Sequence, residues 1–595
     1  MISKKWLISL GLVLLIVVAL TLPACAPPDD EIIDDEEEVV DEEEVVDEEV
    51  AKDYIVGGET MPDSLNMDPE VLMYTNLGCL YLMINYENLA YFPKIDGDPP
   101  EGQYEFIPKL ATDYTITYED GNQIWTVALQ EGVTFHDGED FTADDVIYSL
   151  KHVLNKWDLG KPIDWDAVDE DTGWEEIWPE HVLAEAVDSH TVELTYIEDW
   201  HQPEDYVPDW WGWDPIVPEH VFGPEGEGVY DGWEEDPLLW DGESIGTGPF
   251  KLVEFEPDSY TLFERYDDYW GDLPDAERFL HRFYDDPGAM FTALEAGAID
   301  THEDSSVPFL KLDMYEADPN IEVSFNPGLT MYYMGFNLHP EEGYEPLQDR
   351  TLRQAIAYAI EEQDILDLLF GGYGTVPSGF IYEESENYNP DLPDYSQDLE
   401  MAGELLEDAG YYKENDFWHT PEGEIITFTL TTTSGTFADV GSMITEDMQD
   451  FGLDVTHEVI DTTTFVQYLY WPAEGEMDAF IYGEDPGFDP YSDWIWMMLS
   501  DPYDWGYAWN PTWYNNPEYN ELFMENYVAD DLDDKRNILF RMQEILAEDL
   551  PLIYLYRADF INAHRTDRWE NWYDTIGGPV NWINEYSIRE VTPVE

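Results

Sequence analysis

Short apolar runs alternate with longer amphipathic stretches along the chain from residue 53 onward. The runs at 53–58 and 123–129 are rich in Ile, Val and aromatic residues, and the second alternates apolar and polar positions with the period of two that a half-buried strand requires. The segments 251–256 and 260–265 carry similar runs on either side of a Pro-Asp-Ser sequence, which predicts a β-hairpin.

Apolar residues spaced three and four apart predict helices at 289–296, 352–370, 399–409 and 533–549. The third helix stops before Gly410, the residue type expected just past a helix C-terminus. Strands that alternate with helices indicate an α/β body. No repeat of 20 to 50 residues is visible.

Residues 135–150, FHDGEDFTADDVIYSL, combine His136 with several acids and so raise the question of a metal site. A calcium loop of the EF-hand type needs acids at its positions 1, 3 and 5 before the glycine at position 6. Here Gly138 directly follows Asp137, so the spacing fails. The Asp-Gly pair is instead a turn signal after a strand.

The second half of the same stretch predicts the start of a helix. Thr142, with Asp145 three residues later, is close to a capping box, and acids in a first helical turn are favoured by the helix dipole. An apolar face follows, formed by Ala143, Val146, Ile147, Leu150 and Leu154. The acids are therefore expected to begin a helix, with His136 as a structural residue.

The N-terminal fifty residues predict an export signal and a tether. Two lysines precede an apolar run at 6–20 that is too short to span a bilayer comfortably. The ending Leu-Pro-Ala-Cys25 resembles a bacterial lipobox, whose cysteine is diacylated and becomes the mature N-terminus. Residues 1–24 are then a signal peptide, and 25–52 are a lipidated Cys25 followed by an acidic disordered tether.

The net charge of −112 belongs mostly to the body of the protein, because residues 29–49 hold only fifteen of the 135 acids. So many carboxylates are a property of the whole surface, for which adaptation to high salt is the simplest account and the collection of cationic substrates a secondary one. Nucleic acid is excluded as a partner, because phosphate binding needs clustered Lys and Arg. Two cysteines give no disulfide framework.

Enzyme signatures are weak in this sequence. It has no HExxH pair and no Walker A motif. Residues 242–246 fit GxSxG, but the following Gly-Thr-Gly-Pro cannot open the helix that a nucleophile elbow requires. With 135 acids, a carboxylate pair of the glycosidase type carries no information, although the 23 Trp residues could stack sugars.

Several ordered segments together resemble the family 5 extracellular solute-binding proteins, the receptors of oligopeptide, dipeptide, nickel and some oligosaccharide ABC importers. The matching segments are 129–150, 246–252, 268–271, 293–300, 336–337, 349–350, 352–360, 402–411 and 543–552. Their order along roughly 53–560 carries the resemblance more than any single block does.

The resemblance implies an α/β fold of the periplasmic-binding-protein type, with two lobes, an extra inserted subdomain (cluster C type) and two chain crossings that act as a hinge. The crossings are expected near 326–332 and 553–560. The expected segments are 53–89, 241–326 and 560–595 for lobe I, 90–240 for its inserted subdomain, and 333–553 for lobe II.

The resemblance also suggests which residues recognise the ligand. Peptide-binding members carry a strand ending in Gly-Trp, followed shortly by an Asp that pairs with the α-ammonium of the peptide. The corresponding run here is 478–490, with Tyr482 at the position of the Trp and Asp485 at that of the Asp. The distance to the next proline is one residue longer than usual, so Glu484 and Asp489 remain alternatives. The strand 480–483 could pair with an extended peptide backbone.

The predicted ligand-binding residues are Tyr482, Gly483, Glu484, Asp485, Asp489, Trp494 and Trp496. The function expected is a lipid-anchored, exported receptor, monomeric and without cofactor, that passes oligopeptides to an ABC permease on the outer face of the cytoplasmic membrane and is not an enzyme. An oligosaccharide receptor or, less favoured, a nickel-complex receptor of the same fold are the alternatives. A secreted carbohydrate-active enzyme is the alternative from another class.

Overall fold

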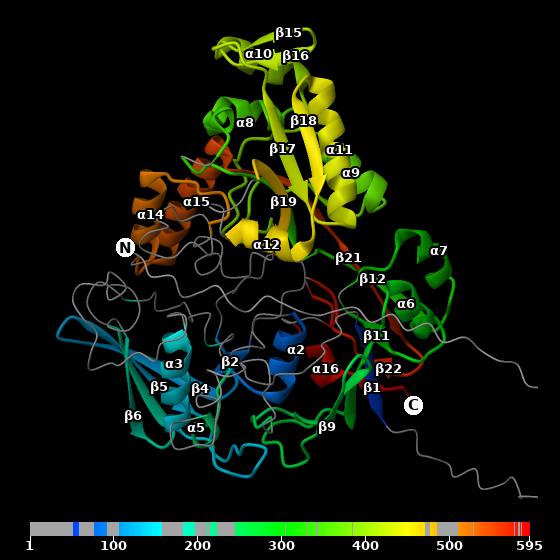
Figure 1. Ribbon diagram of the computed structural model, residues 1–595. Helices are drawn as coiled ribbons and strands as arrows, with labels where there is room; N and C mark the ends of the chain where they lie inside the picture. Colours follow the sequence, from blue (N-terminus) through cyan, green and yellow to red (C-terminus); the bar gives the residue numbers. More distant parts are fainter. Residues whose placement is uncertain are drawn as a thin grey trace, which may run out of the picture. The chain divides into compact units, whose positions relative to one another are not determined.

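The structure, a computed structural model, describes a large part of the chain. The described residues are 52–58, 76–91, 106–156, 182–196, 201, 211, 215–222, 244–303, 305–328, 330–340, 343–383, 385–470, 477–484, 510–527, 529–575, 577–580, 584 and 586–594. Their three larger sheets hold five, four and six strands (Figure 1).

The five-stranded sheet is built around β1 (Asp53–Gly58), which pairs in parallel with β10 (Arg278–Phe283) and β11 (Thr301–His302). The hairpin of β8 (Phe250–Glu256) and β9 (Tyr260–Arg265) continues the sheet antiparallel beyond β10. The strand and the hairpin predicted from the sequence are thereby confirmed.

Both faces of this sheet are covered, which explains why β1 is apolar along nearly its whole length. Tyr54 and Val56 point into one core together with α2 (Asn76–Asn85). Ile55, on the opposite face, packs with Met290 of α6 (Pro287–Glu295). Successive residues of a strand alternate between faces, so a strand buried on both sides needs an unbroken apolar run.

A four-stranded antiparallel sheet has the order β4 (Ala111–Glu119), β5 (Asn122–Leu129), β7 (Thr191–Tyr196), β6 (Val182–Asp188). The helix α3 (Ala143–Lys156) covers one face. Alternate residues of β5 are buried, as its period of two predicted.

The stretch 135–150 forms the turn and helix start that its sequence predicts. The backbone N–H of Thr142 donates to Asp145 Oδ2 (2.8 Å), and the hydroxyl of Thr142 lies 3.1 Å from the same oxygen. Asp145 Oδ1 also accepts from the N–H of Glu219, the first residue of α5 (Glu219–Phe222). Asp145 therefore caps α3 and binds the first residue of α5, which is a structural role.

The six-stranded sheet has the order β14, β20, β13, β19, β17, β18. Their bounds are Gly374–Thr375, Leu552–Ala558, Met331–Phe336, Ala479–Glu484, Thr427–Thr432 and Asp454–Val459. The strands β14, β20, β13 and β19 are antiparallel neighbours, while β17 is parallel to both β19 and β18. Its faces are covered by the largest core of the described residues.

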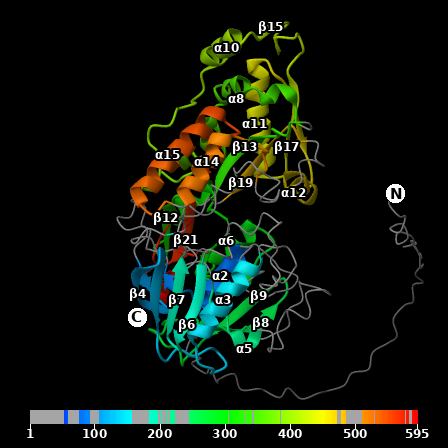
Figure 2. The ribbon, with the colours of Figure 1, turned by 90° about the vertical axis from the view of Figure 1, so that its left-hand side faces the viewer.

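Seven helices surround this sheet in the described part of the chain. They are α8 (Arg350–Ala357), α9 (Glu362–Leu369), α10 (Leu399–Asp408), α11 (Thr436–Phe451), α12 (Thr462–Tyr470), α14 (Pro517–Tyr527) and α15 (Leu532–Asp549). Figure 1 shows α11 beside β17 and β18, and Figure 2 shows α14 beside α15.

Short elements complete the described residues. They are β2 (Ala90–Tyr91), β3 (Ile107–Pro108), α7 (Leu312–Tyr315), β12 (Ile321–Asn326), β15 (Tyr412–Glu414), β16 (Phe417–His419), β21 (Phe560–Arg565), β22 (Trp569–Glu570), α16 (Tyr586–Glu590), β23 (Thr592–Pro593) and 3₁₀ turns at Phe309–Lys311 and Glu345–Gln348.

Acidic side chains cap several helices, so part of the large negative charge stabilises the fold. Asp286, Asp349, Asp398 and Asp531 each accept a hydrogen bond from a backbone N–H in the first turn of the helix that follows. Each such cap stabilises its helix by about 1 kcal/mol. These caps fix the starts of α6, α8, α10 and α15 close to the predicted positions.

The single helix predicted over 352–370 is wrong, because α8 ends at Ala357 and α9 begins at Glu362. The carbonyl of Tyr358 accepts from the N–H of Asp398, and the N–H of Glu361 donates to Asp447 Oδ2 at 3.1 Å. These contacts take backbone groups that a continuous helix would pair internally. Both helices bury their apolar sides in one core, so the apolar spacing runs through the break unchanged.

A buried carboxylate connects three distant segments near the five-stranded sheet. Glu87 is fully buried and accepts from the hydroxyl of Tyr269 (2.7 Å) and the indole N–H of Trp270 (2.6 Å). Arg589 of α16 lies 3.3 Å from the same carboxylate and donates to the hydroxyl of Tyr269. Hydrogen bonds to a buried charge are stronger than neutral ones, so this network fixes α16 to the fold.

Glu362 predicts a pH-dependent stability. Burial, followed by the charges of Glu361, Asp394 and Asp447, raises the pKa of Glu362 to about 8. The folded protein then holds this proton more tightly than the unfolded chain does. Its stabilising contribution is present below about pH 4.5 and is lost as the pH rises through about 8, up to ~5 kcal/mol in all.

We expect Glu362→Gln to unfold at a higher urea concentration than the wild-type protein, and the difference to grow between pH 5.5 and pH 8.5 at constant salt. The control is Glu404→Gln, which removes an exposed acid of α10. A difference between Glu362→Gln and wild type that stays constant with pH would contradict the buried, protonated acid.

Candidate functional site

The chain crosses twice between the two-stranded sheet of β12 and β21 and the six-stranded sheet. One crossing leads from β12 to β13 and the other from β20 to β21. The strands β12 and β21 pair antiparallel along their whole length, and β13 and β20 are neighbours in the six-stranded sheet. The two crossings therefore run side by side (Figure 1).

The crossings touch each other at a glycine. A Cβ atom added to Gly328 would lie far inside van der Waals contact with the carbonyl oxygen of Ala558. The carbonyl of Pro327 accepts a hydrogen bond from the N–H of Gly577. The absence of a side chain at Gly328 thus lets the two backbones approach at the point where the chain changes sheets.

Parallel strands of both sheets end beside these crossings. In open α/β sheets, ligands bind beyond the carboxyl ends of the strands. In the five-stranded sheet these ends are Gly58 of β1 and His302 of β11, and Ser306 soon follows and donates to the carbonyl of Asp559 in the second crossing. In the six-stranded sheet, β19 ends at Glu484.

The end of β19 lies directly at the first crossing. Glu484 is registered opposite Met331, the first residue of β13 after the crossing. Tyr482, Gly483 and Glu484 are half-buried, and the ring of Tyr482 packs on Phe465 at 5.9 Å. The structure thus brings together three of the residues predicted to bind ligand. Asp485, Asp489, Trp494, Trp496 and Cys25 lie outside the described residues.

A group of aromatic rings, here called the aromatic platform, lies next to Gly483. It consists of Tyr332, Tyr556, Phe370 and Phe437. Tyr332 and Tyr556 stack with their centroids 4.5 Å apart and their planes at 10°. A Cβ atom on Gly483 would lie 2.6 Å from the ring of Tyr332, so glycine leaves room for this ring.

Sequence reasoning missed the aromatic platform. Tyr332 and Tyr556 are direct partners across β13 and β20 but are more than 200 residues apart in sequence. Each of the two runs, MYYMGF and LIYLYR, predicts only a buried strand. The register that brings the two rings together depends on the sheet order, for which the sequence holds no local signal.

In the five-stranded sheet, His281 of β10 lies between the hydroxyl of Tyr81 and the carboxylate of Glu303. His281 Nδ1 lies 3.1 Å from the hydroxyl of Tyr81, and His281 Nε2 lies 2.9 Å from Glu303 Oε1. Both His281 and Glu303 are buried. A Cβ atom on Gly58 would overlap His281 Nε2, so glycine at the end of β1 admits the imidazole. The group cross-links β10 to the segment after β11.

His136 is a structural residue in this fold. Its Nε2 lies 2.8 Å from the carbonyl oxygen of Gly248, and its Nδ1 accepts from the N–H of Gly246. Burial lowers the pKa of His136 to about 4, so the imidazole is neutral near pH 7. Among the residues the structure describes, no group of three or more His, Cys, Asp or Glu is arranged to hold a metal ion.

The GxSxG sequence does not form a nucleophile elbow. The segment after Ser244 packs against the backbone of Asn85, which a Cβ atom on Gly246 would strike. It then leads into the strand β8 instead of a helix. Within the described ranges, no helix is both long enough and apolar enough to cross a bilayer.

Comparison with known proteins adds a family match. A model described as bacterial extracellular solute-binding proteins, family 5 middle, matches residues 105–505. The oligopeptide-binding protein AppA of Bacillus subtilis is 24% identical over 464 residues, which cover 75% of this chain and 78% of AppA. Heme-binding protein A of Haemophilus influenzae is 24% identical over 493 residues, which cover 79% of this chain and 80% of that protein.

Solved structures show the same architecture. AppA in complex with a nonapeptide superposes with a TM-score of 0.69 at 22% identity, over 91% of this chain and 99% of AppA. A mannohexaose-bound oligopeptide-binding protein of Thermotoga maritima gives a TM-score of 0.69 at 19% identity, over 92% of this chain and 99% of that one. These matches confirm the predicted α/β fold of the cluster C periplasmic-binding-protein type.

The close approach at the crossings predicts the effect of a single methyl group. Gly328→Ala should destabilise the protein by ~2–4 kcal/mol, because the added Cβ must push the two crossings apart. The control is Gly403→Ala in α10, where the nearest atom would be 3.8 Å away and alanine favours the helix. Equal melting temperatures for the two variants would contradict the contact.

Proposed function

Because the chain belongs to the bacterial extracellular solute-binding proteins of family 5, we propose that it captures oligopeptides at the strand ends beside its two chain crossings and delivers them to an ABC permease. Proteins of this family are non-catalytic receptors of ABC importers, which confirms the expectation that the chain is not an enzyme and removes the alternative of a carbohydrate-active enzyme.

The observation that carries the proposal is the position of β19. Its last residue, Glu484, is paired with Met331, the first residue of β13 after one crossing, and Ser306, which follows β11, donates to the carbonyl of Asp559 in the other crossing. We propose that a peptide adds to this strand by backbone hydrogen bonds, which tolerate many side chains. Its α-ammonium would meet Asp485, with Glu484 and Asp489 as alternatives, and Trp494 and Trp496 would line side-chain pockets.

The crossings supply the mechanism of capture in this proposal. Lobe I would comprise 53–89, 241–326 and 560–595, with 90–240 inserted, and lobe II would comprise 333–553. Rotation at 327–328 and at Asp559 would close the lobes, since these residues lie between paired strands and not within them. Closure removes water from the ligand, which strengthens each charge pair that it makes.

An oligosaccharide is the second candidate ligand, and the aromatic platform favours it. The half-buried ring of Tyr332, which stacks on the buried Tyr556, offers the kind of flat apolar surface that sugar rings pack on. A protein of this fold from Thermotoga maritima was solved with mannohexaose bound. A nickel complex is less favoured, because the described residues hold no cluster of metal-ligating side chains.

A thermal-shift screen tests the proposed ligand class. Random pentapeptides, manno- and gluco-oligosaccharides and nickel–histidine are each added to the purified protein in high salt. We expect peptides to raise the melting temperature and Asp485→Ala to weaken peptide binding by about 2–5 kcal/mol, because it leaves a buried ammonium unpaired. A shift with oligosaccharides alone would replace the peptide assignment, and an unchanged affinity in Asp485→Ala would remove that residue from the site.

We further propose that Cys25 carries the lipid anchor and that the acidic residues 29–49 hold the receptor off the membrane. In a bacterial host, the wild-type protein should partition into the detergent phase of Triton X-114, and Cys25→Ser should move it to the aqueous phase. Equal partitioning of the two proteins would contradict the anchor.

A further inference from the structure

A turn outside the two crossings also connects the segments on either side of them. Phe370, just after α9, packs with the core of the six-stranded sheet, and so does Val376. Tyr373, between them, packs instead with the core that β1, α6 and β21 share. The turn 370–375 thus leaves one core, contacts the other through the ring of Tyr373, and returns.

Two aromatic side chains meet this turn from the other side. Phe325 of β12 stacks on Tyr373, with the ring centroids 5.1 Å apart and the planes at 28°. Phe309 packs with the same core as Tyr373 and lies against the turn, because a Cβ atom on Gly371 would be 2.8 Å from its ring. Gly371 also has φ 68°, a conformation that glycine adopts without strain. Tyr373, Phe325 and Phe309 are here called the aromatic latch.

The aromatic latch lies at the residues about which the hinge is proposed to turn. Phe325 is two residues before the first of them, 327–328, and the carbonyl of Tyr373 accepts from the N–H of Asp559 at 3.4 Å. Rotation at these residues would carry Phe325 and Phe309 with one side of the crossings and Tyr373 with the other. The stacked rings would then have to slide or separate.

The two halves of the aromatic latch are held by different sheets. The strand β14, which begins directly after Tyr373, pairs with β20 of the six-stranded sheet, whereas β12 pairs with β21 along its whole length. Phe325 is 43% exposed, and Tyr373 and Phe309 are half-buried. Because the rings lie near the surface, they can separate while most of both cores stays packed.

We propose that the aromatic latch holds the two sides of the crossings in the orientation of this structure, and that rotation of the lobes requires its rings to part. The inference rests on the hinge in the proposed function and adds a device that sets how readily the hinge turns. A stacked pair stabilises the one orientation in which it forms. A ligand shifts such an equilibrium only through its different affinity for the two orientations, so the latch contributes to the affinity of any ligand that binds another orientation.

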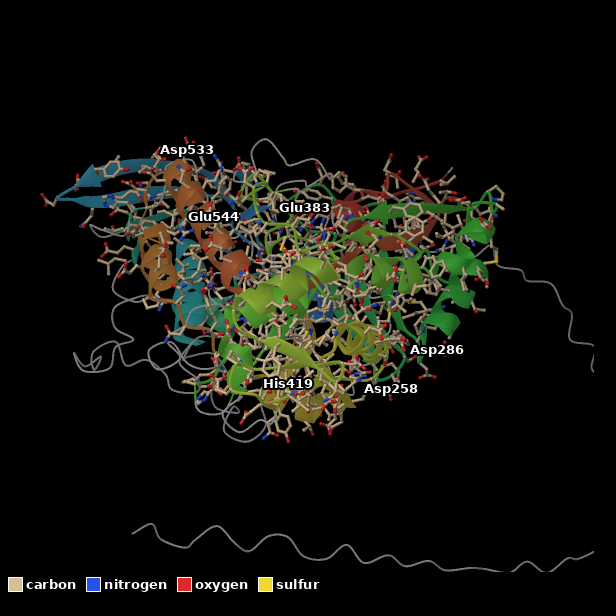
Figure 3. All side chains as sticks on the ribbon, turned by 90° about the horizontal axis from the view of Figure 1, so that it is seen from above. Asp258, Asp286, Glu383, His419, Asp533 and Glu544 are labelled. Atoms are coloured by element: carbon tan, nitrogen blue, oxygen red, sulfur yellow. The ribbon has the colours of Figure 1, made fainter. Side chains whose placement is uncertain are left out.

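The test measures the distance between two spin labels by pulsed electron resonance in the ligand-free protein. The labels are attached at Glu264→Cys on β9 and Asp533→Cys in α15, with the two native cysteines replaced as Cys25→Ser and Cys79→Ala. Both label positions are exposed, and Figure 3 labels Asp533. We expect one dominant distance in this parent protein, and Phe325→Ala to raise the population at other distances about 3- to 10-fold. An unchanged distribution in Phe325→Ala overturns the inference.

Ring-preserving and matched variants separate the aromatic latch from a general loss of packing. Tyr373→Phe keeps the ring and should give the distances of the parent protein, whereas Tyr373→Ala should resemble Phe325→Ala. The matched control is Tyr412→Ala, because Tyr412 is 41% exposed and stacks on His419 at the same 5.1 Å, but within the hairpin of β15 and β16. An equal change in Tyr412→Ala overturns the assignment to the latch.

Random pentapeptides added to the parent protein distinguish this inference from the proposed function. A shift of the label distance with peptides, together with the effect of Phe325→Ala, supports both. If Phe325→Ala acts but no peptide shifts the distance, the latch stands and the peptide assignment falls. If peptides shift the distance but Phe325→Ala leaves the ligand-free protein unchanged, the receptor assignment stands and the latch is overturned.

Discussion

The pairing of the two chain crossings is the constraint on which the rest of the structure depends. The strands β12 and β21 are hydrogen-bonded to each other, and their continuations β13 and β20 are neighbours in the six-stranded sheet. A ribbon two strands wide thus passes from one part of the fold into the next. Glu484, at the end of β19, lies opposite Met331 beside one crossing, and Ser306, after β11, is hydrogen-bonded to Asp559 in the other.

Charge imposes the second constraint. A chain with 135 acids and 23 Lys and Arg residues can neutralise only a small part of its surface. Acids cap helices and accept hydrogen bonds from Tyr and Trp, as Glu87 does, so some of them stabilise the fold without a cation. The arginines are concentrated in contacts that join distant segments, such as Arg568 with Asp300. Salt in the medium is left to screen the remaining repulsion.

Local patterns in the sequence predict the helices and strands well. They predict poorly the contacts that depend on how distant segments pair. The hairpin of β8 and β9, residues 250–265, and the cap at Asp145 follow from patterns local in the sequence. The break between α8 and α9 was missed because both helices share one core, and the apolar spacing continues across it. Glu87 has no local signal at all, since its partners are about 180 and 500 residues away. The three residues on β19 proposed to bind ligand were suggested by the family resemblance, whereas the aromatic platform depends on the strand register.

The internal use of the arginines also shapes how this protein can change over generations. Acids are numerous, so replacing one leaves more than a hundred others and nearly the same surface charge. Replacing an arginine removes a link between segments and leaves a partner such as the buried Glu87 without its counter-charge. Sequence drift should therefore be broad at acidic positions and narrow at the arginines. Among close relatives, the positions of the sparse basic residues should be kept, while those of the abundant acidic residues should vary.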